Sequence, residues 1–218
     1  MERHGERPSK DREAGSTDGH ATAQTSGRAS VPPPDATVLS AARQRDPDGL
    51  ARFFDHYFRL VYGLTFRLLG NTELAEDATQ DIFYRLQRAI DKLDPDRDPT
   101  PWVITVALNA CRSIWRSTAH RMDRQTDSWE PAGDGRHEPV DQGRSPAEEL
   151  EQTEREQVVQ AALLALPENL RSVVVLRDYQ GLNHQEIAAV LGLRHGAVRK
   201  RYSRALHSLA DLLRGKLG

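Results

Sequence analysis

Apolar residues recur at helical spacing in two stretches of the chain, from about residue 36 to residue 118 and from residue 145 nearly to the end. In both stretches, large apolar side chains return every three or four positions, which places them on one face of an α-helix. No segment alternates between apolar and polar residues as a half-buried strand does. The pattern therefore predicts an all-α protein of two small helical domains, the second being a four-helix domain that contains a helix-turn-helix.

Capping residues and prolines predict where the helices of the first stretch begin and end. Asp46-Pro47 has the form of an N-cap followed by proline in the first turn. Gly70 is placed to end the helix that follows. Thr72 is expected to cap a second helix, and Thr100-Pro101 repeats the combination of cap and proline that would open a third.

The second stretch contains the pattern of a helix-turn-helix. Asn183-His184-Gln185-Glu186 resembles a capping box, in which the first and last side chains each accept a hydrogen bond from a backbone N–H. Gly192 is placed to end this short helix, and only two residues separate it from a helix that begins near His195. Two short helices joined by a tight turn that contains glycine are typical of DNA-binding proteins.

The last helix is predicted to be amphipathic, with a cationic outer face. The residues expected to face the core are Val198, Tyr202, Ala205, Leu206, Leu209 and Leu213. Each helical residue turns by about 100°, so positions two before and two after Tyr202 point away from the core. The exposed side is then expected to present His195, Arg199, Lys200, Arg201, Ser203 and Arg204. Arginine and lysine can donate to guanine in the major groove and can also bind phosphates.

Two polar segments flank the first helical stretch. Residues 1–35 contain almost no large apolar side chains and end in a run of prolines, so we expect a disordered tail. Residues 119–144 are polar, contain prolines and glycines and lack apolar periodicity, as expected of a flexible linker. The predicted order is therefore a tail (1–35), a first domain (36–118), a linker (119–144) and a second domain (145–218).

The distribution of charge and the single cysteine add further constraints. The net charge is only −2, but from residue 194 onward the chain is basic and Asp211 is its only acid, whereas residues 127–156 are mainly acidic. This asymmetry predicts a localised anion-binding surface. Cys111 is the only cysteine, which excludes an internal disulfide and a cysteine-based zinc site. Because there is no signal-peptide core and no long apolar run, we expect a cytoplasmic protein without membrane insertion.

Three segments, AEDATQDIF at residues 75–83, PWVITVALN at residues 101–109 and the stretch from LPE at 166–168 to GAVRKR at 196–201, carry a family resemblance. Together they resemble the extracytoplasmic-function (ECF) class of sigma factors, which join RNA polymerase and direct it to promoters. The first segment is AEDATQDIF at residues 75–83, which is similar to the family segment that binds the β′ clamp helices of the polymerase. An acidic helix face suits a basic partner. The resemblance implies that the polymerase-binding residues are Glu76, Asp77, Gln80 and Asp81.

The second segment is PWVITVALN at residues 101–109, which is similar to the family helix associated with the −10 promoter element. In the family, this helix and the loop before it, here residues 93–100, hold melted single-stranded DNA. The resemblance implies that Asn109, Arg112 and Arg116 contact −10 DNA. This chain departs from the family at Thr105 and Ser113, where arginine and aspartate are frequent, so the details of −10 recognition are not carried over.

The third segment runs from LPE at residues 166–168 through GLNHQEIA at 181–188 to GAVRKR at 196–201, and it resembles the domain that reads the −35 element. Arg194 and Ala197 stand where the family usually has serine and threonine, so the −35 sequence is not carried over either. The partners implied by the resemblance are core RNA polymerase, through its β′ clamp helices and β flap, and promoter DNA. Many members of the family are also held inactive by an anti-sigma factor.

The predicted function is that of a sigma factor, which binds core RNA polymerase, recognises −10 and −35 elements and directs transcription initiation at the bacterial nucleoid. The C-terminal motif alone leaves one alternative open, a stand-alone helix-turn-helix regulator that does not bind core polymerase. The eight histidines form no metal-ligand pattern, and we find neither a phosphate-binding glycine loop nor a nucleophile elbow. We therefore expect no catalytic residue, no metal site and no cofactor.

Overall fold

The computed structural model describes residues 32–122 and 146–217, and every regular element within these two ranges is helical. The first range contains α1 (Ala36–Arg43), α2 (Pro47–Leu69), α3 (Thr72–Arg88), the short 3₁₀ turn η1 (Ile90–Lys92) and α4 (Thr100–Met122). The second contains α5 (Pro146–Ala165), α6 (Glu168–Val174), the π-helical turn η2 (Val175–Tyr179), α7 (His184–Leu191) and α8 (His195–Leu217). The all-α prediction is confirmed. Nearly all of the predicted tail and most of the predicted linker lie outside the described residues, and α4 continues to Met122, inside the range predicted as linker.

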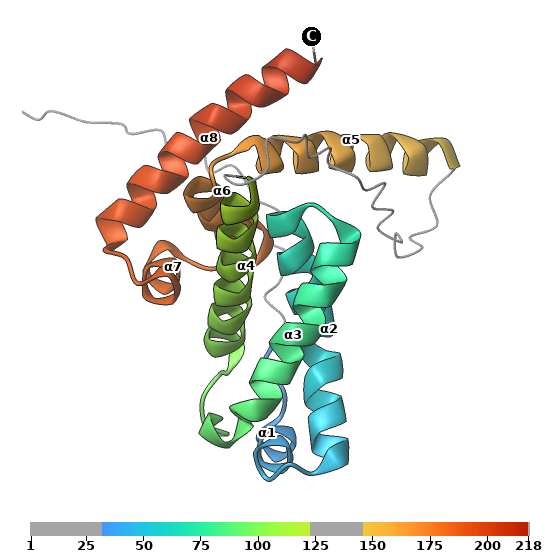
Figure 1. Ribbon diagram of the computed structural model, residues 1–218, viewed down its shortest axis with the longest axis vertical. Coiled ribbons are helices and arrows are strands. Elements are labelled where there is room, and N and C mark those ends of the chain that lie inside the picture. Colours follow the sequence, from blue (N-terminus) through green and yellow to red (C-terminus); the bar gives the residue numbers. More distant parts are fainter. Residues whose placement is uncertain (1–31, 123–145, 218) are drawn as a thin grey trace, which may run out of the picture.

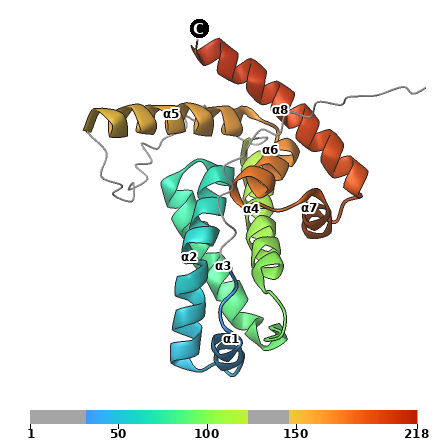
Figure 2. The same cartoon turned by 180° about the vertical axis from the view of Figure 1, so that it is seen from behind.

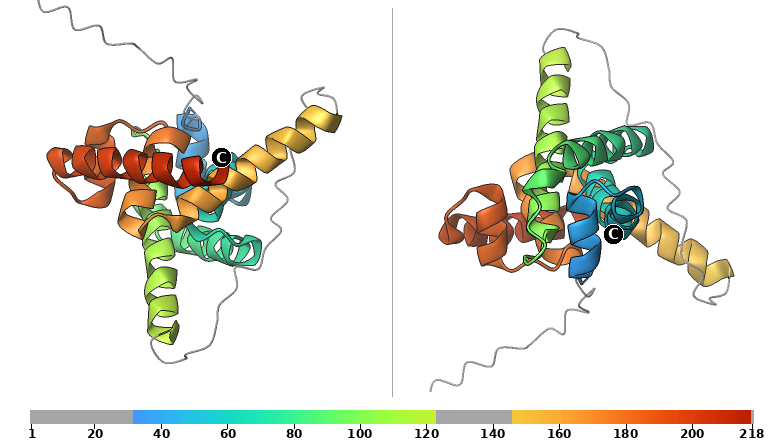
Figure 3. Two further views of the ribbon diagram at one scale, coloured as in Figure 1. Left: turned by 90° about the horizontal axis from the view of Figure 1, so that it is seen from above. Right: turned by 90° about the horizontal axis from the view of Figure 1, so that it is seen from below.

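The helices of the first domain form a bundle on which the second domain sits. In Figure 1, α2, α3 and α4 run side by side and α1 lies across their lower end. The helices α5, α6 and α8 lie at the opposite end, where α5 and α8 cross over the bundle when it is seen from above (Figure 3). α7 lies beside α4, as the reverse view also shows (Figure 2). The helix-turn-helix is therefore packed against the first domain.

The predicted ends of α2 are confirmed by its hydrogen bonds. The Asp46 side chain accepts from the Gly49 N–H at 2.8 Å, and Pro47 is the first helical residue. Gly70 closes the helix in the left-handed conformation, with φ of 72°, and its N–H donates to the Phe66 carbonyl. Glycine adopts this conformation at little cost, which is why it commonly ends helices.

Both threonines predicted as helix caps lie one position inside their helices, so these two predictions are wrong. Asn71 caps α3, and its side-chain oxygen accepts from the Leu74 N–H at 2.8 Å. Asn71 has the extended backbone that a cap requires, and asparagine ranks above threonine at that position. Thr100 is the first residue of α4, its N–H donates to Asp98 at 2.8 Å, and its hydroxyl lies 3.1 Å from the Tyr57 hydroxyl.

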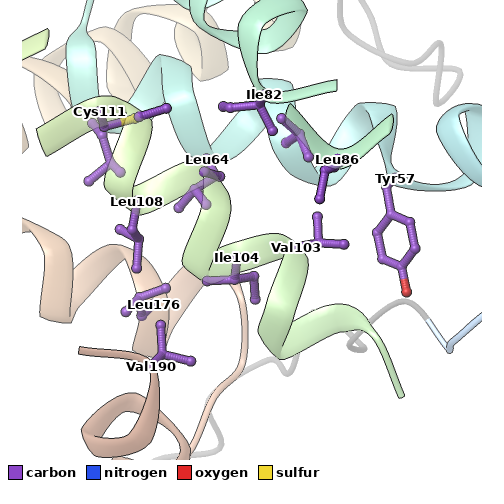
Figure 4. Packing of buried hydrophobic residues seen from close by; sticks show 14 of the residues in the cluster. Tyr57, Leu64, Ile82, Leu86, Val103, Ile104, Leu108, Cys111, Leu176 and Val190 are labelled. Atoms are coloured by element: carbon purple, nitrogen blue, oxygen red, sulfur yellow. The ribbon is translucent and has the colours of Figure 1, made fainter. Parts of the chain in front are cut away.

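One hydrophobic cluster spans both domains, which the sequence pattern does not predict. Leu64 of α2 and Leu108 of α4 are almost fully buried in it, together with Leu176 and Val190 of the second domain. Figure 4 shows Leu108 pointing toward Leu176 and Val190. A smaller cluster inside the second domain consists of Leu163, Leu166, Val174 and Ala205. The two predicted domains are therefore packed into one body.

The buried face of α8 is narrower than predicted. Val198 and Ala205 are fully buried, but Leu206 is 43% exposed, so its assignment to the core is wrong. At about 100° per residue, Leu206 lies roughly 80° around the helix from Val198, at the edge of the buried stripe. Leu209 and Leu213 are partly buried.

Candidate polymerase and promoter interfaces

The α3 helix presents the acidic face that the sequence predicts. Its buried side faces α2 and α4 through Ala75, Ala78 and Ile82. This orientation leaves the opposite side exposed, and that side carries Glu76, Asp77, Gln80 and Asp81. Asp81 forms an ion pair with Arg85 at 2.7 Å, one turn further along the helix. Within the described part of the chain, no ion pair involves Glu76 or Asp77, so their charges are available to a basic partner.

Aromatic side chains border this acidic face, and the sequence analysis missed them. Phe58 of α2 is 52% exposed and Tyr84 of α3 is 58% exposed, although large apolar groups are normally buried. The Phe58 ring stacks on Tyr62 and Phe83, with ring centroids 6.0 and 6.3 Å apart. Burial and the nearby Glu76 carboxylate raise the pKa of Tyr62. The aromatic residues at positions 54, 58, 62 and 66 recur at the i, i+4 spacing that could have revealed them.

The α4 helix brings the three predicted −10 residues to one face. Asn109 and Arg116 are exposed, Arg112 is partly buried, and the three lie within about 60° of one another around the helix. The Arg112 guanidinium donates to the Asn109 side-chain oxygen at 3.3 Å. Thr105 lies on the same side, and its hydroxyl donates to the Pro101 carbonyl at 2.7 Å. This face therefore carries fewer charges than a helix with arginine at position 105.

The buried side of α4 is apolar and packs into the core. It carries Leu108 and Cys111, both almost fully buried. Burial raises the pKa of the Cys111 thiol to about 12, so the group is protonated at neutral pH. A buried thiol of this kind is inert. Cys111 therefore acts as a small apolar side chain in the core.

The loop before α4 is held by its own aspartates. The Asp94 side chain accepts from the Asp96 N–H at 3.2 Å, and the Asp98 side chain caps the start of α4. Leu93 and Pro99 are buried and anchor the two ends of the loop. The loop predicted to supply the −10 base pocket is therefore a short ordered turn at the start of the helix that carries Asn109, rather than an extended arm.

The helix-turn-helix has the predicted geometry. The capping box is complete, because Asn183 accepts from the Glu186 N–H at 3.0 Å and Glu186 accepts from the Asn183 N–H at 2.6 Å. Gly192 ends α7 at φ of 66°, and α8 begins at His195. The predicted DNA-contacting side chains on α8 are exposed, with Arg201 partly buried: His195, Arg199, Lys200, Arg201, Ser203 and Arg204.

No ion pair within the described residues neutralises these bases. Val198 and Ala205, on the other side of the helix, are fully buried and fix which face points outward. Arginine and lysine side chains that are both exposed and unpaired can reach phosphates and guanine edges. The exposed face of α8 is therefore suited to a DNA major groove.

A hydrogen bond between Tyr202 and Asp178 ties α8 to the π-helical turn η2. The Tyr202 hydroxyl donates to Asp178 at 2.8 Å, and burial together with this bond raises the pKa of Tyr202 to about 12. Burial raises the pKa of Asp178, an effect that the Tyr202 hydrogen bond opposes. The sequence analysis placed Tyr202 in the core and did not predict this bond.

His184 packs between the two helices of the motif. Its ring lies 5.4 Å from the Tyr202 ring and 6.1 Å from the His195 ring. Burial lowers the pKa of His184, and the electrostatic effects of Arg177, His195 and Arg199 lower it further, although Asp178 opposes the shift. The imidazole therefore stays neutral at pH 7 and does not add a charge to the DNA-facing surface.

Two further observations concern metal binding and membrane insertion. Among the residues described, no group of three or more histidine, cysteine, aspartate or glutamate side chains is placed to hold a metal ion. None of the helices within ranges 32–122 and 146–217 is long and apolar enough to cross a membrane.

Two family models match separate parts of the chain. Residues 53–121 match the family described as Sigma-70 region 2, and residues 156–209 match Sigma-70, region 4. The chain is 29% identical over 179 residues to the ECF RNA polymerase sigma factor SigW of Bacillus subtilis, covering 81% of this chain and 95% of SigW. It is 30% identical over 166 residues to the RNA polymerase sigma factor CarQ of Myxococcus xanthus, covering 76% of this chain and 90% of CarQ.

Solved structures show a similar fold. The structure of CnrH in complex with the cytosolic domain of CnrY matches 83% of this chain and 97% of that chain, with a TM-score of 0.57 and 25% identity. The co-crystal structure of the sigma factor RpoE with the anti-sigma factor NepR from Bartonella quintana matches 75% of this chain and 96% of that chain, with a TM-score of 0.61 and 20% identity. The chain therefore belongs to the ECF class of sigma-70 factors, regulatory proteins that bind core RNA polymerase and promoter DNA to direct transcription initiation.

Proposed function

We propose that this sigma factor docks on core RNA polymerase through the acidic face of α3 and holds promoter DNA with α4 and α8. The observation that carries the proposal is the segregation of charge: exposed acids on α3 and exposed bases on α8 lie on one body. A basic polymerase surface requires an acidic partner, whereas a DNA groove requires a basic one. The α3 face meets the first requirement and the α8 face meets the second.

The polymerase contact is assigned to Glu76, Asp77, Gln80 and Asp81. Glu76 and Asp77 are exposed and join no ion pair within the described residues, so a basic partner can pair with them without breaking an existing contact. The family resemblance points to the β′ clamp helices as that partner, and to the β flap as the second contact, made by the second domain.

The −35 contact is assigned to the outer face of α8. Ser203 and Arg204 lie on the side opposite the buried Val198 and Ala205. Arg199 and Lys200 lie nearer the start of the same helix, where the positive helix dipole also favours a phosphate. His195 and Arg201 flank this group. A base contact by Arg204 and phosphate contacts by its neighbours would together fix the register on DNA.

The −10 contact is assigned to Asn109, Arg112 and Arg116. Their shared face on α4 is polar, and the short loop 93–99 lies at the start of that helix. Cations of this kind follow the phosphates of a single strand. Because Thr105 stands where arginine is frequent in the family, we expect position 105 to add no charged contact to −10 DNA.

We also propose that the protein acts in the cytoplasm, at the nucleoid, and that an anti-sigma factor restrains it. CnrH and RpoE are each seen in complex with a protein partner, CnrY and the anti-sigma factor NepR. A protein that covered the acidic face of α3 would compete with polymerase for Glu76 and Asp77. The proposal therefore predicts that anti-sigma binding and polymerase binding exclude each other.

The docking assignment is tested by charge reversal. Asp77→Arg should abolish capture of core polymerase by the tagged chain, because it places a cation against a basic partner. Asp48→Arg is the matched control, since Asp48 is also an exposed acid but lies at the other end of the bundle. Capture of polymerase by Asp77→Arg at the wild-type level would show that α3 is not the docking face.

A further inference from the structure

A buried tyrosine of α2 reaches the start of α4. Tyr57 is only 1% exposed, and its hydroxyl lies 3.1 Å from the Thr100 hydroxyl, so either group can donate a hydrogen bond to the other. In Figure 4, Tyr57 lies on the Val103 side of the cluster, at the opposite end of the labelled residues from Cys111. The bond therefore joins the middle of one helix to the first residue of another, 43 positions later in the chain.

Packing alone does not require the Tyr57 hydroxyl. One turn earlier on the same buried stripe of α2, Phe53 is fully buried and fills the core with a phenyl ring, its centroid 4.9 Å from that of the Tyr57 ring. A buried hydroxyl is unfavourable unless it has a hydrogen-bonding partner. Burial raises the pKa of Tyr57 to about 12, so the hydroxyl keeps its proton at neutral pH. The hydroxyl is therefore a specific polar contact within an apolar site.

Thr100 closes the loop that precedes α4. Leu93 and Pro99 are buried at the two ends of this loop, and the residues between them are mostly exposed. Aspartate side chains within the loop accept from the N–H groups of residues 96 and 100. Within ranges 32–122 and 146–217, the Tyr57 hydroxyl makes the only hydrogen bond that ties residues 94–100 to a helix other than α4.

This bond lies on the side of α4 that faces away from the proposed −10 contacts. At about 100° per residue, Asn109, Arg112 and Arg116 lie roughly 120–180° around the helix from Thr100. Tyr57 is buried inside the bundle and cannot touch DNA itself. Any effect of its hydroxyl on promoter DNA must therefore pass through the loop and the start of α4.

A loop held in one conformation selects a base more sharply than a mobile loop. A flexible surface can repack around a wrong base, which reduces the difference in affinity between two bases. A fixed surface leaves some polar groups of a wrong base, or of the pocket, without partners, and this lowers its affinity. Selectivity for a base therefore depends on what holds the loop in place.

We propose that Tyr57 is a positioning residue for promoter recognition: its hydroxyl holds Thr100 and thereby fixes the loop 93–99 in the conformation that selects a −10 base. This inference rests on the proposed function, in which that loop supplies the base pocket. Among the residues that the structure describes, the Tyr57 hydroxyl has no hydrogen bond to α3 or α8. Its removal should therefore leave polymerase docking and −35 selectivity unchanged.

The first test measures base selectivity in the complete initiation complex. Templates are selected from a random pool with the wild-type chain and core polymerase, and each position of the −10 block is then replaced by each of the four bases. We expect Tyr57→Phe to reduce discrimination against the three disfavoured bases at one or more −10 positions by about 2- to 10-fold, the range for one neutral hydrogen bond. Discrimination within the −35 block should stay at the wild-type level. Wild-type selectivity of Tyr57→Phe at every −10 position would overturn the proposal.

Variants at two threonines separate positioning from simple stability. Thr100→Val removes the other hydroxyl of the bond but keeps the N–H that Asp98 accepts, so it should reduce −10 selectivity as Tyr57→Phe does. Thr100→Ser keeps a hydroxyl and should retain selectivity. The control Thr65→Val removes a buried hydroxyl of α2 that bonds to Thr79 of α3 rather than to the loop. Thr65→Val should lower Tm alone, and an equal loss of −10 selectivity in this control would show that selectivity merely follows stability.

The double variant Tyr57→Phe/Thr100→Val tests whether the two hydroxyls act as one contact. Removing both partners of a single bond removes one interaction, so the double variant should lose no more −10 selectivity than either single variant. Losses that add up would show that the two hydroxyls act separately, and the proposal would be wrong.

Hydrogen exchange in the free chain tests the loop without DNA. The N–H groups of residues 96, 97 and 100 are bonded within the loop and exchange when the loop opens. We expect these amides to exchange about 2- to 10-fold faster in Tyr57→Phe than in wild type, and at wild-type rates in Thr65→Val. Unchanged exchange in Tyr57→Phe would show that its hydroxyl does not hold the loop.

The outcomes separate this inference from the proposed function. If the wild-type chain discriminates among −10 bases and Tyr57→Phe does so equally well, the inference alone fails. If the wild-type chain supports no transcription, or shows no base preference in any −10 block, the proposed function fails and this inference falls with it. Should Tyr57→Phe not fold, Thr100→Val and Thr100→Ser decide, because Thr100 is only half-buried.

Discussion

Removing one hydroxyl should loosen the helix that faces −35 DNA. Tyr202→Phe keeps the ring, and with it the packing against His184, but deletes the group that donates to Asp178 at 2.8 Å. Asp178 belongs to the π-helical turn η2, so this bond fixes the position of α8 relative to the rest of the motif. The change therefore tests whether a side chain without DNA contact positions the recognition helix.

The size of the effect follows from the bond and its surroundings. A hydrogen bond to a charged group contributes about 1.5–3 kcal/mol to stability, and Asp178 is exposed, so we expect the lower end, ~1.5 kcal/mol. For a body of this size, that corresponds to a fall in Tm of about 3–6 °C. The Tyr202 bond lowers the pKa of Asp178 and so stabilises its ionised form. The difference in unfolding free energy between variant and wild type should therefore shrink as the pH falls and Asp178 becomes protonated.

Thermal unfolding at pH 7 and pH 4, together with binding to a −35 duplex, measures both consequences. Tyr84→Phe is the matched control, because Tyr84 is 58% exposed and its hydroxyl forms no hydrogen bond with any described residue. We expect Tyr202→Phe to lower both Tm and DNA affinity at pH 7 while polymerase capture is unchanged. A Tm for Tyr202→Phe equal to that of Tyr84→Phe would refute the reasoning.

Three further predictions follow from the same structure. Arg204→Ala should weaken binding to the −35 element by about 1–3 kcal/mol if Arg204 contacts bases, measured by titration against matched and mutated duplexes; equal weakening on every sequence would argue for a phosphate contact instead. Gly49→Ala should destabilise the chain by about 1–3 kcal/mol in urea unfolding, because the added Cβ would lie 2.6 Å from the Ala41 Cβ. The added Cβ of the control Gly196→Ala meets nothing within 4 Å, so this variant should change stability by less than about 1 kcal/mol, and equal losses would contradict the prediction. Because the folded pKa of His184 is lowered, the unfolded chain binds a proton more readily, so acidification from pH 7 to pH 5 should destabilise wild type more than His184→Gln; parallel pH profiles would exclude that role.

Local features of the fold could be predicted from the sequence because neighbouring residues determine them. The capping box at Asn183 and Glu186 forms as predicted, and Gly70 and Gly192 end their helices with positive φ. These interactions join residues within four positions of one another. The threonine caps were misplaced by one position because Asn71 precedes Thr72 and competes for the same role.

Contacts between the two domains could not be predicted in the same way. Arg171 donates to Leu68, which lies 103 positions earlier in the chain, and nothing in the local pattern around either residue indicates the pairing. Leu108 and Val190 each look like ordinary core residues of their own domains, yet they lie in the same cluster. Periodicity shows that a helix face is buried but does not show which helix covers it.

The same distinction between local features and contacts of separate helices applies to the candidate site. Exposure of Asp77 and Arg204 follows from helical periodicity, so both faces were predictable. The Tyr202–Asp178 bond and the exposed Phe58 were not, because each depends on how separate helices are placed in space. For the same reason, the sequence analysis assigned Leu206 to the core, although it lies at the exposed edge of α8.

Transcription from a pool of random templates, with purified core polymerase and this chain, tests the central claim most directly. The account predicts transcripts that require the chain, from templates that share two upstream sequence blocks at a nearly constant spacing. One block should be bound through α8 and the other through α4. Transcription no greater than with core polymerase alone, or active templates that share no upstream block, would contradict the account.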